Sequence, residues 1–188
     1  MRIGVLALQG AFIEHERKIM EMGGEAVELR TQSDLSASLD GIVLPGGEST
    51  VQMKLLKESG MYAPLKDAIE AGTPVLGTCA GLILLASSIE GQKETCFSSL
   101  PVTVRRNAYG RQLGSFHTEA VVEGEGIVKM TFIRAPVVTK AGEGVEILSL
   151  VGGEIVAVRY ESRYGLAFHP ELESLSDSEW IYRRVFNL

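Results

Sequence analysis

The fold is decided by one stretch in the first half of the chain, Pro74-Val75-Leu76-Gly77-Thr78-Cys79-Ala80-Gly81. It predicts a short apolar strand, a tight turn bounded by glycines, and a largely apolar helix that continues to about Ser88. Strand and helix patterns alternate around it: strands at 3–8, 26–29 and 41–44, and helices at 11–22, 49–59 and 63–71. This alternation predicts a parallel sheet with helices on both faces.

The pattern changes after about residue 95. Short strands separated by Gly-rich turns are expected at 101–105, 116–122, 128–133, 145–150 and 155–160, followed by a strand at 164–168 and a helix at 176–186. No linker separates the halves, and 188 residues suit one domain of ordinary size. We therefore expect residues 1–188 to form a single α/β domain, doubly wound in three layers, with a mostly parallel sheet and an antiparallel extension.

Composition excludes several classes of protein. Apolar residues at 45% and charged residues at 22% are typical of globular chains, and 18 Lys and Arg against 24 Asp and Glu give a net charge of −6. Without a long basic run, no nucleic-acid partner is expected. No apolar run is long enough for a membrane span, and no signal peptide is recognisable. The two cysteines form no disulfide framework, which favours the cytoplasm.

The turn at Cys79 has the pattern of a nucleophile elbow, with cysteine in place of serine. In this turn the side chain projects above the sheet at a helix N-terminus, where the helix dipole favours thiolate over thiol. The backbone N–H of Ala80 would point to the place where an oxyanion forms. Cys96 has no such context, so we expect it to pack as a small apolar residue.

Of the three histidines, His169 is the candidate base. It follows the apolar strand at 164–168 and would emerge at the carboxyl edge of the sheet, as Cys79 does. Glu171 follows after Pro170 and could orient the imidazole. His15 is expected on a solvated face of the first helix, and His117 on the surface of a strand.

A third motif, Leu44-Pro45-Gly46-Gly47-Glu48-Ser49-Thr50, follows the strand at 41–44. It is not a P-loop, and no Gly-x-Gly-x-x-Gly fingerprint follows the first strand, so no nucleotide cofactor is expected, and no metal either. The paired glycines could supply a second backbone N–H to an oxyanion. The alternative, which the sequence leaves open, is a tight turn capped by Ser49.

Together these motifs resemble the glutaminase subunit of pyridoxal 5′-phosphate synthase (the PdxT family), a class I glutamine amidotransferase of the triad type with a flavodoxin-like fold. The resemblance extends from Gly4 to the terminal helix. The segments that carry it are Leu8-Gln9-Gly10-Ala11, Leu44 to Thr50, Gly77 to Gly81, Arg105-Arg106-Asn107-Ala108-Tyr109-Gly110-Arg111-Gln112 and Phe168-His169-Pro170-Glu171.

The resemblance implies hydrolysis of L-glutamine to L-glutamate and ammonia. Cys79 would attack the side-chain amide carbon, with His169 as base and Glu171 as its orienting partner, and the N–H groups of Gly47 and Ala80 would stabilise the oxyanion. The residues that it implies for glutamine binding are Gly47, Glu48, Ser49, Arg106, Ile133 and Arg134. The two arginines have an independent reason, because guanidinium binds an α-carboxylate in a bidentate manner.

The resemblance also implies a partner. This is a synthase subunit with a (β/α)8 barrel (the PdxS family), which assembles with the glutaminase into a large hetero-oligomer and uses the ammonia to make pyridoxal 5′-phosphate. The docking surface would include Gln9, Gly10 and the loop at Gly46 and Gly47. Since glycine carries no steric penalty for either orientation, we expect the peptide between Gly46 and Gly47 to rotate between open and blocked oxyanion geometries when the partner binds.

Three alternatives share some of these features. The glutaminase of imidazole glycerol phosphate synthase has the same triad, but the Arg105 to Gln112 segment favours the first interpretation. Cysteine hydrolases on a related fold place histidine directly after the nucleophile, where this chain has Ala80. A non-catalytic regulatory subunit would not need the complete set of Cys79, His169 and Glu171.

Overall fold

The computed structural model describes residues 1–36, 38–109 and 114–188. The first half contains β1 (Arg2–Leu6), α1 (Phe12–Glu21), β2 (Glu25–Leu29), the 3-10 helix η1 (Gln32–Ser36), β3 (Gly41–Leu44), α2 (Ser49–Glu58), α3 (Tyr62–Glu70), β4 (Val75–Thr78) and α4 (Ala80–Leu85). The second half contains β5 (Ala86–Ile89), β6 (Leu100–Arg105), β7 (Ser115–Val122), β8 (Gly126–Ile133), β9 (Val137–Ala141), β10 (Glu146–Val151), β11 (Glu154–Tyr160), β12 (Arg163–Leu166), the 3-10 helix η2 (Pro170–Leu172) and α5 (Leu175–Phe186).

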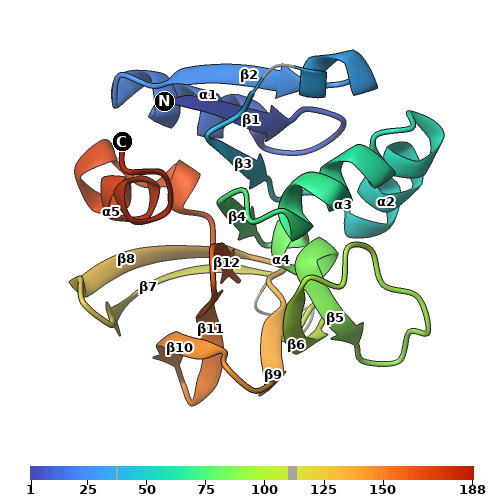
Figure 1. The fold of residues 1–188 in the computed structure, drawn as a ribbon. Helices are drawn as coiled ribbons and strands as arrows, with labels where there is room; N and C mark the ends of the chain where they lie inside the picture. Colours follow the sequence, from blue (N-terminus) through green and yellow to red (C-terminus); the bar gives the residue numbers. More distant parts are fainter. Residues whose placement is uncertain (37, 110–113) are drawn as a thin grey trace.

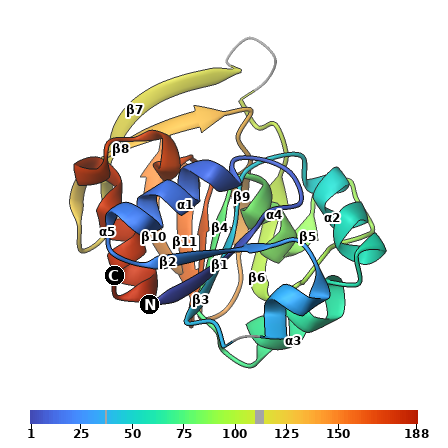
Figure 2. The same ribbon diagram turned by 90° about the horizontal axis from the view of Figure 1, so that it is seen from above.

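One large sheet forms the middle layer, in the order β2-β1-β3-β4-β12-β11-β9-β6-β5, with β10 paired to β11. The strands from β2 to β12 pair in parallel, and β11 begins the antiparallel part. Helices α1 and α5 cover one face, and α2, α3 and α4 cover the other (Figures 1 and 2). The predicted doubly wound arrangement with an antiparallel extension is confirmed.

Two local predictions were wrong or incomplete. The helix predicted to reach Ser88 ends at Leu85, because Ala86–Ile89 forms β5, which pairs in parallel with β6. The Ser87 hydroxyl donates to the Val102 carbonyl at 3.1 Å, a contact across strands that a further helical turn would lose. Strand β9 was not predicted, although β-branched residues begin it, and it joins β11 to β6.

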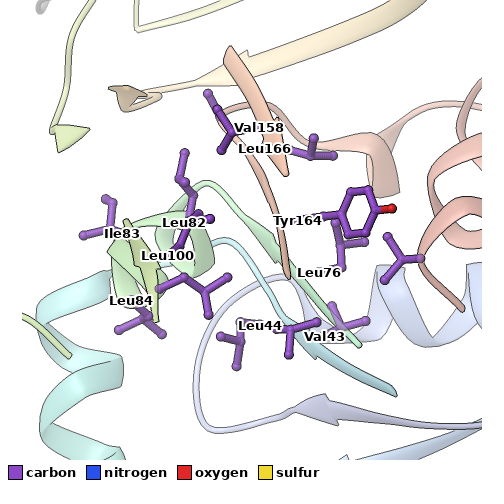
Figure 3. Close-up of a cluster of buried hydrophobic side chains, with 14 of the residues drawn as sticks. Val43, Leu44, Leu76, Leu82, Ile83, Leu84, Leu100, Val158, Tyr164 and Leu166 are labelled. Atoms are coloured by element: carbon purple, nitrogen blue, oxygen red, sulfur yellow. The ribbon is translucent and has the colours of Figure 1, made fainter. Parts of the chain in front are cut away.

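The central strands β3, β4 and β12 are buried at every position, which explains their continuous apolar character. Figure 3 shows Val43, Leu76 and Leu166 from these strands packed in the cluster that also holds Leu82, Ile83 and Leu84 of α4.

Because β3, β4 and β12 are parallel neighbours, their carboxyl ends lie at one edge of the sheet. The register pairs Leu44 with Gly77 and Leu166 with Thr78, so the segments that follow these strands emerge side by side.

No helix in the described ranges has the length and apolar character needed to span a bilayer.

Candidate active site

Cys79 occupies a strained turn between β4 and α4. Its backbone has φ 49° and ψ −101°, a positive φ that is costly for any residue other than glycine, and its N–H donates to the Leu166 carbonyl at 2.8 Å. A Cβ built at Gly77 would lie 2.7 Å from the Gly81 backbone, so glycine is needed where the strand and the helix meet. The turn therefore has the nucleophile-elbow geometry that the sequence predicts.

His169 and Glu171 form a buried pair next to this turn. His169 Nδ1 lies 2.7 Å from Glu171 Oε1, and the side chains are 6% and 3% exposed. A Cβ built at Gly46 would lie 2.4 Å from His169 Cε1 and 3.5 Å from Cys79 Cβ. The imidazole, the cysteine and the loop after β3 thus converge within van der Waals distance of one point.

The protonation of this pair follows from its contacts. Burial alone would lower the pKa of His169, but its interactions with Cys79 and Glu171 outweigh burial and raise that pKa to about 10. Burial alone would raise the pKa of Glu171, but His15 and His169 outweigh it and hold that pKa below the usual value. At neutral pH the pair is therefore an imidazolium beside a carboxylate.

The loop after β3 is tied to the loop after β1. The Gly46 carbonyl accepts from the Ala11 N–H at 3.0 Å, and the Gln9 side-chain oxygen accepts from the Glu48 N–H at 2.8 Å. Helix α2 begins at Ser49, with Glu48 at the N-cap position and no side-chain capping hydrogen bond. The alternative of a turn capped by Ser49 is therefore wrong, because Ser49 lies inside the helix.

A cavity of about 240 Å³ opens beside Cys79. Of the residues proposed from the sequence, Ala80 and Glu171 do not line it. The others do: Gly47, Glu48, Ser49, Cys79, Arg106, Ile133, Arg134 and His169. Gln9, Gly10, Ala11, Gly46, Ile83 and Asn107 complete the lining. The Cys79 sulfur lies 3.9 Å from the Ile133 carbonyl oxygen. Gly110, Arg111 and Gln112 lie outside the described residues.

Charged groups lie at the rim of this cavity. Glu48 lies between the two arginines, with Arg106 Nη2 at 3.8 Å and Arg134 Nη2 at 3.7 Å from its carboxylate oxygens. Arg106 also donates to the Thr50 hydroxyl at 3.3 Å. Two cations and one anion around a small cavity match the carboxylate and ammonium of a free amino acid.

The prediction that His15 lies on a solvated face of the first helix was wrong. The side chain has no exposed surface and contacts Thr78, Tyr182 and Glu171. Its position in the sequence carries a signal for this, since His15 lies on the same helical face as Ile19, the other buried residue of α1.

The expected surface position of His117 on a strand and the expected packing of Cys96 as a small apolar residue are confirmed. His117 is exposed on β7, with Nδ1 2.7 Å from the Thr131 hydroxyl. Cys96 is 5% exposed, and burial raises the pKa of its thiol to about 12.

The sequence pattern of the SNO glutamine amidotransferase family matches residues 5–186. The chain belongs to this family. Among its relatives, a protein of Desulfitobacterium hafniense (strain Y51) named pyridoxal 5′-phosphate synthase subunit PdxT is 58% identical over 172 residues, which are 92% of this chain and 86% of that protein. A protein of the same name from Streptococcus pneumoniae serotype 2 is 52% identical over 175 residues, covering 92% and 91% of the two chains.

Solved structures agree with the family assignment. A glutamine amidotransferase crystal structure has a TM-score of 0.91 and 40% identity, with 99% of each chain covered. The structure of PurLQS from Thermotoga maritima has a TM-score of 0.71 at 16% identity, covering 99% of this chain and 97% of that one, and shows the fold alone. Within the described ranges of this SNO family member, no cluster of three or more His, Cys, Asp or Glu could hold a metal ion.

Proposed function

We propose that residues 1–188 form one glutaminase domain, the subunit of a pyridoxal 5′-phosphate synthase that hydrolyses L-glutamine to L-glutamate and ammonia. The observation that carries the proposal is the convergence of Cys79, His169 and Glu171 at one sheet edge, beside a cavity with two arginines. Membership of the SNO family and relatives named PdxT support this over another amidotransferase or a regulatory subunit.

The reaction begins with Cys79. The thiolate attacks the side-chain amide carbon of glutamine, and the N–H groups of Gly47 and Ala80 stabilise the oxyanion. When the C–N bond breaks, His169 gives its proton to the leaving nitrogen, and ammonia departs from a thioester. Its raised pKa suits this step, because the ring already holds a proton at neutral pH. Water then attacks the thioester, His169 takes a proton from this water, and glutamate and the thiolate are released. Glu171 orients the ring throughout.

Arg106 and Arg134 bind the α-carboxylate of glutamine, and Glu48 is placed to bind its α-ammonium group. Ser49 lines the cavity, and the Ile133 backbone carbonyl faces the reacting sulfur.

Removal of the Arg106 guanidinium should weaken substrate binding. We expect Arg106→Leu to raise KM for glutamine roughly 10- to 100-fold with a smaller change in kcat, because a charge-assisted hydrogen bond contributes about 1.5–3 kcal/mol. Arg105→Leu is the matched control, since Arg105 pairs with Glu154 at 3.0 Å and does not line the cavity. Steady-state kinetics of glutamate formation measure both. Equal KM values for the two variants would remove Arg106 from the binding site.

The ammonia requires an acceptor. A synthase subunit with a (β/α)8 barrel, of the PdxS family, is the proposed partner in a large hetero-oligomer, and docking would involve Gln9, Gly10 and the loop at Gly46 and Gly47. In a trans peptide the carbonyl and N–H point in opposite directions, so with the Gly46 carbonyl bonded to Ala11 the Gly47 N–H points away from the β1 loop. Rotation of this peptide would exchange the two groups, and the bound partner would hold the geometry in which the Gly47 N–H is available to the oxyanion.

Gly10 provides a way to test this loop. Its φ is +109°, and an added Cβ would lie 1.9 Å from the Gly46 carbonyl oxygen. Gly10→Ala should therefore displace that carbonyl and lower kcat about 100-fold, the cost of one oxyanion donor. Gly72→Ala is the control, because Gly72 has φ +95° but open space around it. Glutaminase assays with the synthase present should separate the two variants. If Gly10→Ala had the same kcat as Gly72→Ala, the position of the Gly46 carbonyl would have no effect on catalysis.

The test of the whole proposal is reconstitution. The chain is mixed with a pyridoxal 5′-phosphate synthase subunit, and product is followed from glutamine and, in parallel, from ammonium. We expect glutamine-dependent product only when both proteins are present, and faster glutamine hydrolysis than by the chain alone. Equal rates of glutamine hydrolysis with and without the synthase would refute the activation by the partner.

The two cysteines of the chain are both free, which supports a location in the cytoplasm.

A further inference from the structure

A buried histidine contacts the carboxylate of the proposed triad from the side opposite to His169. His15, on α1, has no exposed surface, and its Nε2 lies 3.3 Å from Glu171 Oε2 and 3.2 Å from the Thr78 hydroxyl. Its Nδ1 lies 2.8 Å from the Tyr182 hydroxyl on α5. Glu171 therefore lies between two imidazoles, with one carboxylate oxygen toward each.

The contacts decide which nitrogen of His15 carries the proton. Burial lowers the pKa of His15, so the ring is neutral and has one N–H. The ionised Glu171 can only accept, which places the proton on Nε2, whereas the Tyr182 hydroxyl can donate to Nδ1. Burial also raises the pKa of Tyr182, which keeps this hydroxyl protonated.

Glu171 Oε2 depends on this ring. It is fully buried and has no hydrogen bond of standard geometry in the described part of the chain, where its polar contact is with His15 Nε2 at 3.3 Å. An ionised carboxylate oxygen without a donor is unfavourable in the interior, so loss of His15 would favour the protonated acid or a rotated carboxylate. Either change weakens the hydrogen bond between Oε1 and His169.

We propose that His15 is a positioning residue for the glutaminase reaction, which donates its Nε2–H to Glu171 Oε2 and so keeps Oε1 directed at His169. The inference rests on the proposed function. His15 does not line the cavity, so it acts through Glu171 and His169 and never touches the substrate. The resulting chain of polar contacts runs from Tyr182 through His15 and Glu171 to His169.

Two substitutions at one position test the inference in the complex with the synthase. His15→Leu fills the same space without a donor and should lower kcat 10- to 100-fold, the usual effect of removing a partner that orients a functional group, with KM changed less than about twofold. His15→Gln places an amide N–H₂ near the position of Nε2 and should recover kcat to within about threefold of the wild type. Tyr182→Phe, which removes only the donor to Nδ1, should show a smaller loss of kcat.

The pH profile distinguishes positioning from a structural role. The titratable groups that face His15 are Glu171 and His169, Tyr182 on α5 and Glu14 on α1. Glu171 is ionised above its lowered pKa, and activity is lost as the pH falls through it. Without the His15 donor this pKa rises, so the acid limb of kcat should move to higher pH in His15→Leu but not in His15→Gln.

The outcomes separate the inference from the function on which it rests. An active wild type with equal losses in His15→Leu and His15→Gln, or a loss confined to KM, or an unmoved acid limb, would overturn the inference alone. A wild type that hydrolyses no glutamine with the synthase present would overturn both. Thermal unfolding is measured for each variant. If His15→Leu does not fold, a kcat of His15→Gln within about threefold of the wild type and a shifted acid limb of kcat in Tyr182→Phe would support the inference. The absence of these two results would overturn it.

Discussion

Cys79→Ala is expected to abolish pyridoxal 5′-phosphate formation from glutamine and to leave formation from ammonium intact. Without the sulfur no thioester can form, and removal of a triad nucleophile leaves only the residual catalysis of the oxyanion site, so the glutamine-dependent rate should fall by roughly four orders of magnitude or more. The ammonium-dependent rate belongs to the synthase and does not need this thiol. Both rates are measured in the reconstituted complex.

Cys96→Ala is the matched control for this substitution. Cys96 is buried away from the cavity and is the second of the two cysteines in the sequence. We expect this variant to retain the glutamine-dependent rate, with some loss of thermal stability from the space left in the core. A Cys79→Ala protein that still used glutamine would contradict the assignment of the nucleophile.

His169→Asn should be the second most damaging substitution. Asparagine can still hydrogen-bond to Glu171 through its amide but can neither hold a proton beside the Cys79 thiolate nor give one to the leaving nitrogen. We expect kcat to fall by roughly three to four orders of magnitude, with KM for glutamine changed far less because the arginines remain. Initial rates of glutamate release, with the synthase at saturation, measure the effect.

His117→Asn provides the comparison, because His117 is exposed on β7 and bonds only to the Thr131 hydroxyl among the groups of the described chain. Its rate should equal that of the wild type. If the two asparagine variants were equally active, His169 would have no part in proton transfer.

The sequence predicts this site well because its main residues follow central parallel strands. The runs that became β3, β4 and β12 are continuously apolar, as strands buried on both faces must be, and their carboxyl ends necessarily meet. Cys79 and His169 could therefore be placed together without knowing any distance. The glycines of the elbow can also be predicted from the sequence, because a side chain at Gly77 would clash with the Gly81 backbone.

Features that depend on distant segments could not be predicted in the same way. His15 reads as one polar residue among charged neighbours, and its burial depends on Tyr182 and Glu171, which come more than 150 positions later in the chain. Likewise Ala86–Ile89 continues an apolar helix in sequence and becomes a strand only because β6 is available to pair with it. Local propensity is overridden by partners that the local sequence does not reveal.

The central claim is that Cys79 is the thiol that reacts with the glutamine side chain. The most direct test exposes the complex to a diazoketone analogue of glutamine, which alkylates a thiolate with loss of N₂, and locates the adduct by peptide mass spectrometry. We predict one adduct per chain at Cys79, none at Cys96, and protection by excess glutamine. An adduct at Cys96, or continued glutamate formation with Cys79 fully modified, would contradict it.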